Sequence, residues 1–143
     1  MSVNRFFSTP DHSKAVDAAL LLLRLVAGLA FALHGWGKIQ HPFNWMGPDG
    51  FAPAPLQALA AISEFGGGLA WILGLLTPLA SFGVACTMAV ATWTLAVTRG
   101  DPFVASGPGP AFELPAVYLC VALLLIASGA GRWSLDRAVF GKR

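Results

Sequence analysis

The chain has 143 residues, of which 56% are hydrophobic and only 11% are charged. This composition, with a mean hydropathy of +0.67, is far from the usual mix of a soluble domain. The formal net charge is only +2 and the basic residues are dispersed, which argues against nucleic acid as a partner. No segment outside the apolar stretches reaches the size of a soluble domain, about 50 residues or more. We therefore interpret residues 1–143 as a single membrane domain.

Four apolar stretches are long enough to cross a hydrocarbon core of roughly 30 Å, which takes about 20 residues of helix. They predict an all-α fold, an integral membrane antiparallel four-helix bundle embedded in the lipid bilayer. The expected spans are residues 18–37, 56–76, 78–98 and 114–131.

The distribution of basic residues predicts the orientation of this bundle. Most Lys and Arg residues lie in the two terminal segments, whereas only Lys38 and Arg99 flank the opposite side. By the positive-inside rule, both termini are expected to be cytoplasmic. Tryptophans at the membrane interfaces would then form an aromatic belt. The expected outer pair is Trp36 and Trp93, and the expected inner pair is Trp71 and Trp133.

The connections between the expected helices are rich in turn-forming residues. The segment "GLLTP", residues 74–78, predicts a tight antiparallel hairpin between the second and third helices. Thr77 is expected to cap the third helix, and Pro78 suits its first turn because the missing N–H costs nothing there. Residues 39–55 are expected to form an ordered lip on the outer side, and residues 99–111 have the same turn-rich character.

Two charged residues, Arg24 and Glu64, fall inside expected spans, where each costs about 3 kcal/mol on insertion scales. Such residues usually face a partner or a wet cavity. We expect Arg24 and Glu64 to meet as an ion pair, either as the floor of a polar pocket or as a structural pair that fixes helix register. A stripe of residues at intervals of three and four on the first helix should face the interior. It comprises Arg24, Gly28, Phe31, Gly35 and Lys38.

Mixed charges gather in the outer half of the expected bundle. His34, Lys38, Glu64 and Glu113 all fall there, and such a cluster can tune proton-coupled chemistry, which makes these four the candidate catalytic residues. Simpler interpretations stand beside this one. His34 suits an interfacial histidine, Lys38 can extend its ammonium to the interface, and an acid such as Glu113 is favoured in the first turn of a helix. No set of His and Cys has ligand spacing, so no metal site is expected.

Other features narrow the chemistry further. Cys86 and Cys120 lie in different spans without CxxC spacing, which is typical of small core residues rather than a redox pair. Gly67 and Gly68, on the face of Glu64, should permit close helix contact. The chain has no dinucleotide fingerprint, P-loop or haem-attachment motif, which argues against a flavin or nicotinamide cofactor.

Three segments together resemble the DoxX/DoxD family of small four-helix membrane proteins. They are "RLVAGLAFALHGWGK" (residues 24–38), "EFGGGLAWILGLLTP" (residues 64–78) and "ELPAVYLCVALLLIASGAGRWSLD" (residues 113–136). The resemblance implies a bacterial inner-membrane protein with oxidoreductase character. Some relatives are described as thiosulfate:quinone oxidoreductase subunits and others are tied to thiol and oxidative stress. The family's recurring polar and glycine positions correspond here to Arg24, His34, Gly35, Lys38, Glu64, Glu113 and Asp136.

The resemblance and the charge placement together suggest a quinone as the cofactor. A quinone head group would accept hydrogen bonds from His34 or Lys38, while Glu64 or Glu113 moves protons. The further residues assigned to this binding site are Arg24, Gly35 and Trp36. Because the chain lacks a redox-competent Cys pair and an added soluble domain, direct thiosulfate chemistry in this chain alone is not expected.

Two other functions remain open at this point. The chain could be a non-catalytic membrane anchor that recruits a redox partner protein through Phe43, Trp45 and Phe51 of the first outer loop. Alternatively, intramembrane Arg and Glu residues also line permeation paths for small solutes or protons. Four short helices leave little room for a path, and no inverted repeat is evident, so transport would require a homo-oligomer.

Overall fold

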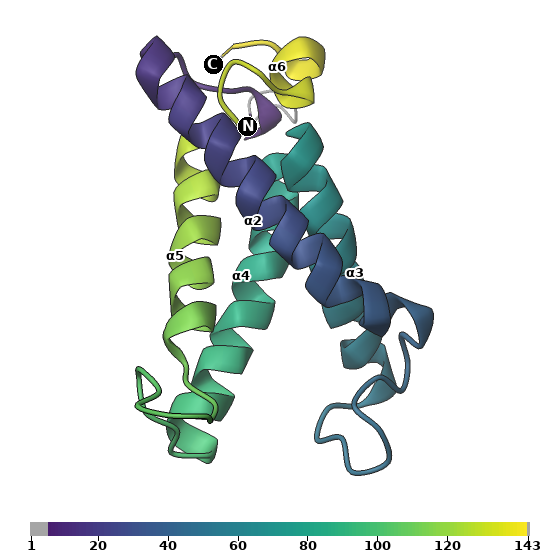
Figure 1. The fold of residues 1–143 in the computed structure, drawn as a ribbon. Helices are drawn as coiled ribbons and strands as arrows, with labels where there is room; N and C mark the ends of the chain where they lie inside the picture. The colour runs from purple at the N-terminus through teal and green to yellow at the C-terminus, as the bar shows by residue number, and fades with distance from the viewer. Residues whose placement is uncertain (1–5, 143) are drawn as a thin grey trace.

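The computed structural model describes residues 6–142, and its regular elements are helical (Figure 1). A π-helical segment, η1 (Thr94–Thr98), directly continues one of the long helices. Within the described residues there is no strand, only an isolated bridge between Thr9 and Lys142. The predicted all-α fold class is therefore confirmed. The helices are α2 (Lys14–Gln40), α3 (Ala54–Leu73), α4 (Thr77–Trp93), α5 (Glu113–Ser128) and the short α6 (Leu135–Phe140).

Three helices are long and apolar enough to cross a membrane, namely α2, α3 and α4 together with η1. They contain most of the predicted spans 18–37, 56–76 and 78–98. Helix α5 is apolar but has only 16 residues, a length of about 24 Å. It ends before the predicted boundary at residue 131, because Gly129 and Gly131 both adopt positive φ angles, 69° and 78°.

The long helices pack as two pairs, α2 with α3 and α4 with α5, which are joined by contacts between α3 and α4. Figure 1 shows the pairs close together at the end that carries both termini and apart at the opposite end. We call these the closed end and the open end. The two longer connections, residues 41–53 and 99–112, both lie at the open end (Figure 1).

Small residues let α2 and α3 approach closely. A Cβ atom on Gly28 would lie 2.7 Å from the Gly68 carbonyl oxygen, and one on Gly68 would lie 2.5 Å from the Ala32 backbone nitrogen. Gly35 is equally tight against the backbone of Phe65 on α3. The predicted role of Gly68 in close helix contact is confirmed, and the same feature extends to two glycines of α2.

Aromatic packing centres on Trp71, which is fully buried. Its ring lies edge-on to Phe31, with centroids 5.3 Å apart, and its indole nitrogen donates to Ser81 Oγ. The prediction that Trp71 marks the inner membrane interface is thus wrong. The prediction that Cys86 and Cys120 are core residues is also wrong, since both are free and exposed on the outside of the helices.

Arg24 is completely buried at the closed end, and it is not paired with Glu64. Its guanidinium donates to the carbonyl oxygens of Trp71, at 3.1 Å, and Trp133, at 2.6 Å. The predicted Arg24–Glu64 ion pair is therefore wrong. The last carbonyl groups of a helix lack intrahelical partners and carry partial negative charge, so the end of α3 attracts a cation, and the Asp136 carboxylate adds to this attraction.

Asp136 provides the cap that the sequence assigned to Thr77. Its carboxylate accepts hydrogen bonds from the backbone nitrogens of Leu76, at 2.6 Å, and Thr77, at 2.8 Å. The Thr77 side chain caps nothing, whereas Pro78 lies in the first turn of α4 as predicted. The carboxylate suits this place because the first N–H groups of a helix are unpaired and carry partial positive charge.

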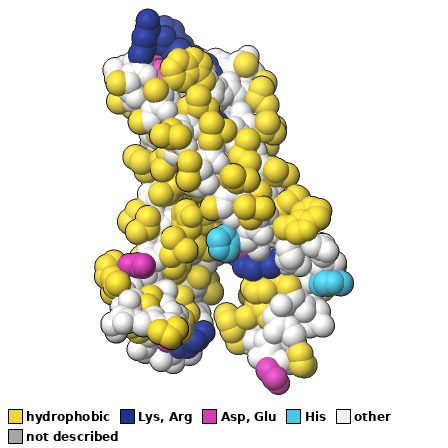
Figure 2. All heavy atoms as spheres, in the orientation of Figure 1, with side chains coloured by type: hydrophobic (Ala, Val, Ile, Leu, Met, Phe, Trp, Pro, Cys, Tyr) yellow, Lys and Arg dark blue, Asp and Glu magenta, His cyan; other side chains and the backbone are white. Residues whose placement is uncertain are grey.

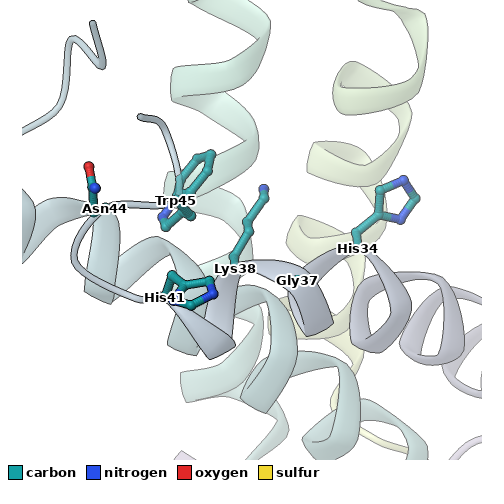
Figure 3. Close-up of a pocket in the computed structure, with 6 residues that line it drawn as sticks. All are labelled: His34, Gly37, Lys38, His41, Asn44 and Trp45. Carbon is teal, nitrogen blue, oxygen red and sulfur yellow. The ribbon is translucent and has the colours of Figure 1, made fainter. Parts of the chain in front are cut away.

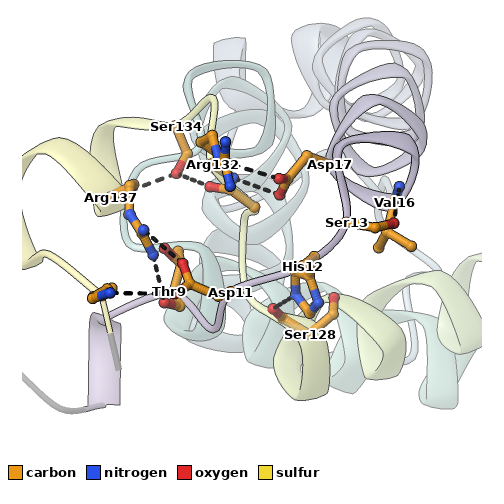
Figure 4. A network of polar contacts seen from close by, with 12 residues as sticks. Thr9, Asp11, His12, Ser13, Val16, Asp17, Ser128, Arg132, Ser134 and Arg137 are labelled. Atoms are coloured by element: carbon orange, nitrogen blue, oxygen red, sulfur yellow. Dashed lines mark hydrogen bonds and ion pairs between the residues drawn. The ribbon is translucent and has the colours of Figure 1, made fainter.

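Further polar contacts fasten the two terminal segments together at the closed end (Figure 4). The Asp17 carboxylate, 2% exposed, accepts from the Arg132 backbone nitrogen and lies 3.5 Å from its guanidinium. Arg137 donates to the Thr9 carbonyl and to Asp11. The hydrogen bond from Arg137 holds the pKa of the Asp11 carboxyl below its usual value. The closed end is thus stabilised by contacts distant in sequence.

The glycine contacts lead to a stability prediction. Gly68→Ala should lower the free energy of unfolding by about 1 to 3 kcal/mol, because the added methyl group would force α2 and α3 apart. Thermal or denaturant unfolding in detergent, followed by circular dichroism, measures the change. Gly66→Ala is the matched control, since its Cβ would meet nothing nearer than Ile62 Cγ2 at 3.9 Å. Equal losses in both variants would contradict the proposed close contact.

Candidate functional site

An ion pair between α2 and α3 forms the polar centre of the open end. Lys38 Nζ lies 2.6 Å from both carboxylate oxygens of Glu64. The Glu64 side chain is only 6% exposed and that of Lys38 is 27% exposed. The pair is therefore largely shielded from solvent, while Lys38 stays accessible to a ligand. Gly35 brings α2 against the α3 backbone at the residue following Glu64, which places the two charges within reach of each other.

The connection between α2 and α3, residues 41–53, closes over this ion pair. The indole of Trp45 lies against the Lys38 ammonium, with Nζ 4.4 Å from the ring centroid. The negative face of an aromatic ring attracts a cation in this position. Trp45 Nε1 donates to the Gln57 carbonyl at 2.9 Å. The buried Gln57 side chain in turn binds the backbone at Met46 and Ala52. The predicted ordered lip is confirmed.

Gln57 is the residue of this site that the sequence interpretation missed. Its signal was present, because it is a polar residue near the start of a helix whose other polar residues are Ser63 and Glu64. Trp45 was predicted as an exposed docking residue, and this is wrong, since it is half-buried between Lys38 and Gln57. Phe43 and Phe51 are exposed as predicted, at 63% and 66%.

His34 lies one helical turn before Lys38 on α2. Its Nδ1 is 2.8 Å from the carbonyl oxygen of Ala30, and the ring is otherwise exposed. Figure 3 shows His34 and Lys38 extending from the same side of α2. The spacing of four residues places such side chains in neighbouring positions on a helix.

A cavity of about 480 Å³ lies beside these residues (Figure 3). Figure 2 shows the open end deeply notched, with histidine and basic side chains near the notch and hydrophobic side chains around it. The notch separates the parts of the two helix pairs that lie at the open end. Its lining residues are His34, Gly37, Lys38, His41, Asn44 and Trp45.

The structure separates the other predicted site residues from this cavity. Gly35 is buried in the contact between α2 and α3, and Trp36 is exposed beside Phe65. Arg24 is fourteen residues before Lys38, about 21 Å along α2. Glu113 is exposed in the first turn of α5. Of the predicted residues, His34 and Lys38 line the cavity, and Glu64 joins them through Lys38.

The arrangement offers a small and specific set of polar groups. Lys38 supplies an ammonium, His34 an imidazole, and Trp45 an aromatic face, while Glu64 balances the charge. Residues 6–142 contain no group of three His, Cys, Asp or Glu side chains that could hold a metal ion. The arrangement therefore presents polar hydrogen-bonding groups at fixed positions beside an aromatic face.

Comparison with known proteins places these features in a family. A family model described as DoxX matches residues 19–97, which cover most of α2, all of α3 and nearly all of α4 with η1. The chain belongs to the DoxX family. The match includes His34, Lys38 and Glu64, and it confirms the resemblance inferred from the sequence.

Two relatives extend the similarity over most of the DoxX chain. One is an uncharacterized protein of Haemophilus influenzae, 34% identical over 125 residues, which are 86% of this chain and 92% of the relative. The other is the "Inner membrane protein YqjF" of Escherichia coli, 29% identical over 136 residues, 87% of this chain and 94% of the relative. No solved structure matches the chain significantly. Together with its apolar helices, the family membership identifies a membrane protein.

The ion pair can be tested by a double-mutant cycle on the free energy of unfolding. Lys38→Met, Glu64→Gln and the double variant should give a coupling energy of about 1 to 3 kcal/mol, because each single change leaves a screened partner unpaired. The matched control is the pair of Arg99 and Asp101, where the Arg99 side chain is 54% exposed. Its coupling should stay below about 1 kcal/mol. Equal coupling energies in the two cycles would show that the Lys38–Glu64 pair contributes no more to stability than an exposed pair does, which would contradict the prediction.

Proposed function

We propose that this DoxX-family protein binds the head group of a membrane-soluble quinone in the cavity beside Lys38. In this proposal it is the membrane subunit of a redox system that handles sulfur, thiol or oxidative-stress chemistry. The observation that carries the proposal is the Lys38–Glu64 ion pair, held by two close helices at the edge of a cavity of about 480 Å³. That volume lies within the range of small-molecule sites, roughly 300 to 1,000 Å³.

The surroundings of the cavity support a ligand that arrives from the bilayer. Leu33, the residue before His34 on α2, is 68% exposed. In this proposal, exposed apolar side chains of α2 accommodate the apolar tail of the ligand. In this proposal such a molecule enters through the notch at the open end (Figure 2).

The residues of the site have distinct proposed roles. Lys38 donates a hydrogen bond to a ring oxygen, and His34 contacts a second ring substituent from the preceding turn. Glu64 exchanges protons with the site through Lys38, to which both of its oxygens are bonded. Trp45 covers the pair and restricts water from the loop side.

The proposal includes a membrane topology. Helix α5 would serve as the fourth span of a four-helix bundle in the bacterial inner membrane, with the closed end in the cytoplasm. Lys14, Arg132 and Lys142 lie at that end, which agrees with the positive-inside rule. Arg5 and Arg143, which contributed to the same prediction, lie outside the described residues. The printed name of the Escherichia coli relative supports the choice of membrane.

Quinone binding is the direct test of this function. Full-length protein in lipid nanodiscs, titrated with a short-chain benzoquinone, should bind it with a measurable Kd. Glu64→Gln should weaken binding about tenfold, because the neutral amide no longer attracts and orients the Lys38 ammonium as the carboxylate does.

The matched control for this titration is Asp49→Asn, the same chemical change at an exposed carboxylate of the first outer loop, and it should leave the Kd unchanged. Circular dichroism confirms that each variant is folded. Absence of binding in the wild-type protein, or equal Kd values for all three proteins, would refute the proposal.

A second function, recruitment of a redox partner protein, is favoured by one observation. Phe43 and Phe51 are exposed at 63% and 66% on a loop whose backbone Gln57 holds in place. Ordered, exposed aromatic residues are frequent anchors of protein interfaces. In this alternative the chain is a non-catalytic anchor, and the loop is its docking surface.

Crosslinking in intact cells tests the alternative. A photoreactive residue introduced at position 43 should form a discrete adduct with one partner protein, and Phe51→Ser should reduce that adduct at least several-fold. A photoreactive residue at position 29, where Leu29 is exposed on the apolar face of α2, is the control and should crosslink to lipid alone. Identical adduct patterns at the two positions would refute a docking role for the loop.

A further inference from the structure

The hydrogen bond of His34 fixes which of its two ring nitrogens carries the proton. Nδ1 lies 2.8 Å from the carbonyl oxygen of Ala30. A carbonyl oxygen only accepts hydrogen bonds, so Nδ1 must be the donor. In a neutral imidazole the other nitrogen is then an acceptor. Nε2 of His34 therefore presents a lone pair, and no described residue donates to it.

The neighbouring polar group has the opposite character. Lys38 carries three N–H donors and no acceptor, and its bonds to the two oxygens of Glu64 leave one N–H free. Side chains four residues apart on a helix have Cβ atoms about 5 to 6 Å apart. The cavity thus offers one acceptor and one donor at adjacent positions of its lining, and a ligand that satisfies both must donate to His34 and accept from Lys38.

We propose that the cavity selects the dihydroxy form of a quinone-type ring, the hydroquinone, over the dicarbonyl form. One hydroxyl group donates a hydrogen bond to Nε2 of His34, while an oxygen atom attached to the ring accepts a hydrogen bond from Lys38. The oxygens of a dicarbonyl ring only accept, so it satisfies Lys38 and leaves Nε2 without a partner. This inference rests on the proposed function and adds to it the redox form that binds.

The preference has an expected size. His34 is exposed, so a ring that binds against it displaces water from Nε2; leaving Nε2 without a hydrogen bond in that complex typically weakens binding by about tenfold. We therefore expect the Kd for the hydroquinone to be about tenfold lower than that for the matching quinone. The preference should depend on His34, because Lys38 donates equally well to both forms.

The test measures both Kd values for one short-chain benzoquinone and its hydroquinone. The full-length protein in lipid nanodiscs is titrated with each form in the absence of oxygen at mildly alkaline pH. In the wild-type protein the hydroquinone should bind about tenfold more tightly, and in His34→Ala the ratio should fall to about one. His41→Ala is the matched control, since this second histidine lines the same cavity but its ring forms no hydrogen bond within residues 6–142. It should change both Kd values by the same factor.

The outcomes separate this inference from the proposed function. Equal Kd values in the wild-type protein, or tighter binding of the quinone, would overturn the selectivity while leaving quinone binding intact. Absence of binding by either form would overturn both.

A ligand-free measurement provides a second test. Nitrogen-15 NMR of histidine-labelled protein, with His34→Ala used to assign the signal, should place the ring proton of His34 on Nδ1. A proton on Nε2 would overturn the inference even if the two ligand forms bind differently.

Discussion

A charged side chain inside a bilayer must find a partner of opposite sign, and this requirement organises both ends of the molecule. At the open end, Glu64 is compensated by Lys38 with two short contacts of 2.6 Å. At the closed end, the Arg24 guanidinium donates to backbone carbonyl groups, and the Asp136 carboxylate adds electrostatic attraction. Both arrangements depend on the close approach of α2 and α3, because a wider separation would leave the charges without partners.

The two ends differ in how completely their polar groups are enclosed. Near the termini, Arg24, Asp17 and Asp136 are almost fully buried and bind backbone atoms, as structural groups do. At the open end, Lys38 remains partly exposed and lines a cavity, so the same kind of charge is available to a ligand. The divergence of the helix pairs therefore separates a structural end from a candidate binding end within a small chain (Figure 1).

Composition and periodicity were sufficient to predict the helices and the stripe on α2, because both follow from local hydrophobicity and from 3.6 residues per turn. The proximity of His34 and Lys38 follows from the same periodicity. The partners of the charges could not be predicted in this way, since the Arg24 acceptors are backbone atoms that any sequence provides. The cap of α4 was missed for a related reason, because Asp136 comes 60 residues after Leu76. Glu113 lay in the predicted outer half, but helix divergence leaves it exposed outside the cavity lining.

The cap that Asp136 provides for α4 has a consequence for how the protein is made. A ribosome releases residues in order, so α4 has been synthesised well before its capping carboxylate exists. Until then, the first backbone nitrogens of α4 and the guanidinium of Arg24 lack the native partners that Asp136 and Trp133 supply. Final docking of the helices therefore follows the emergence of these two residues from the ribosome.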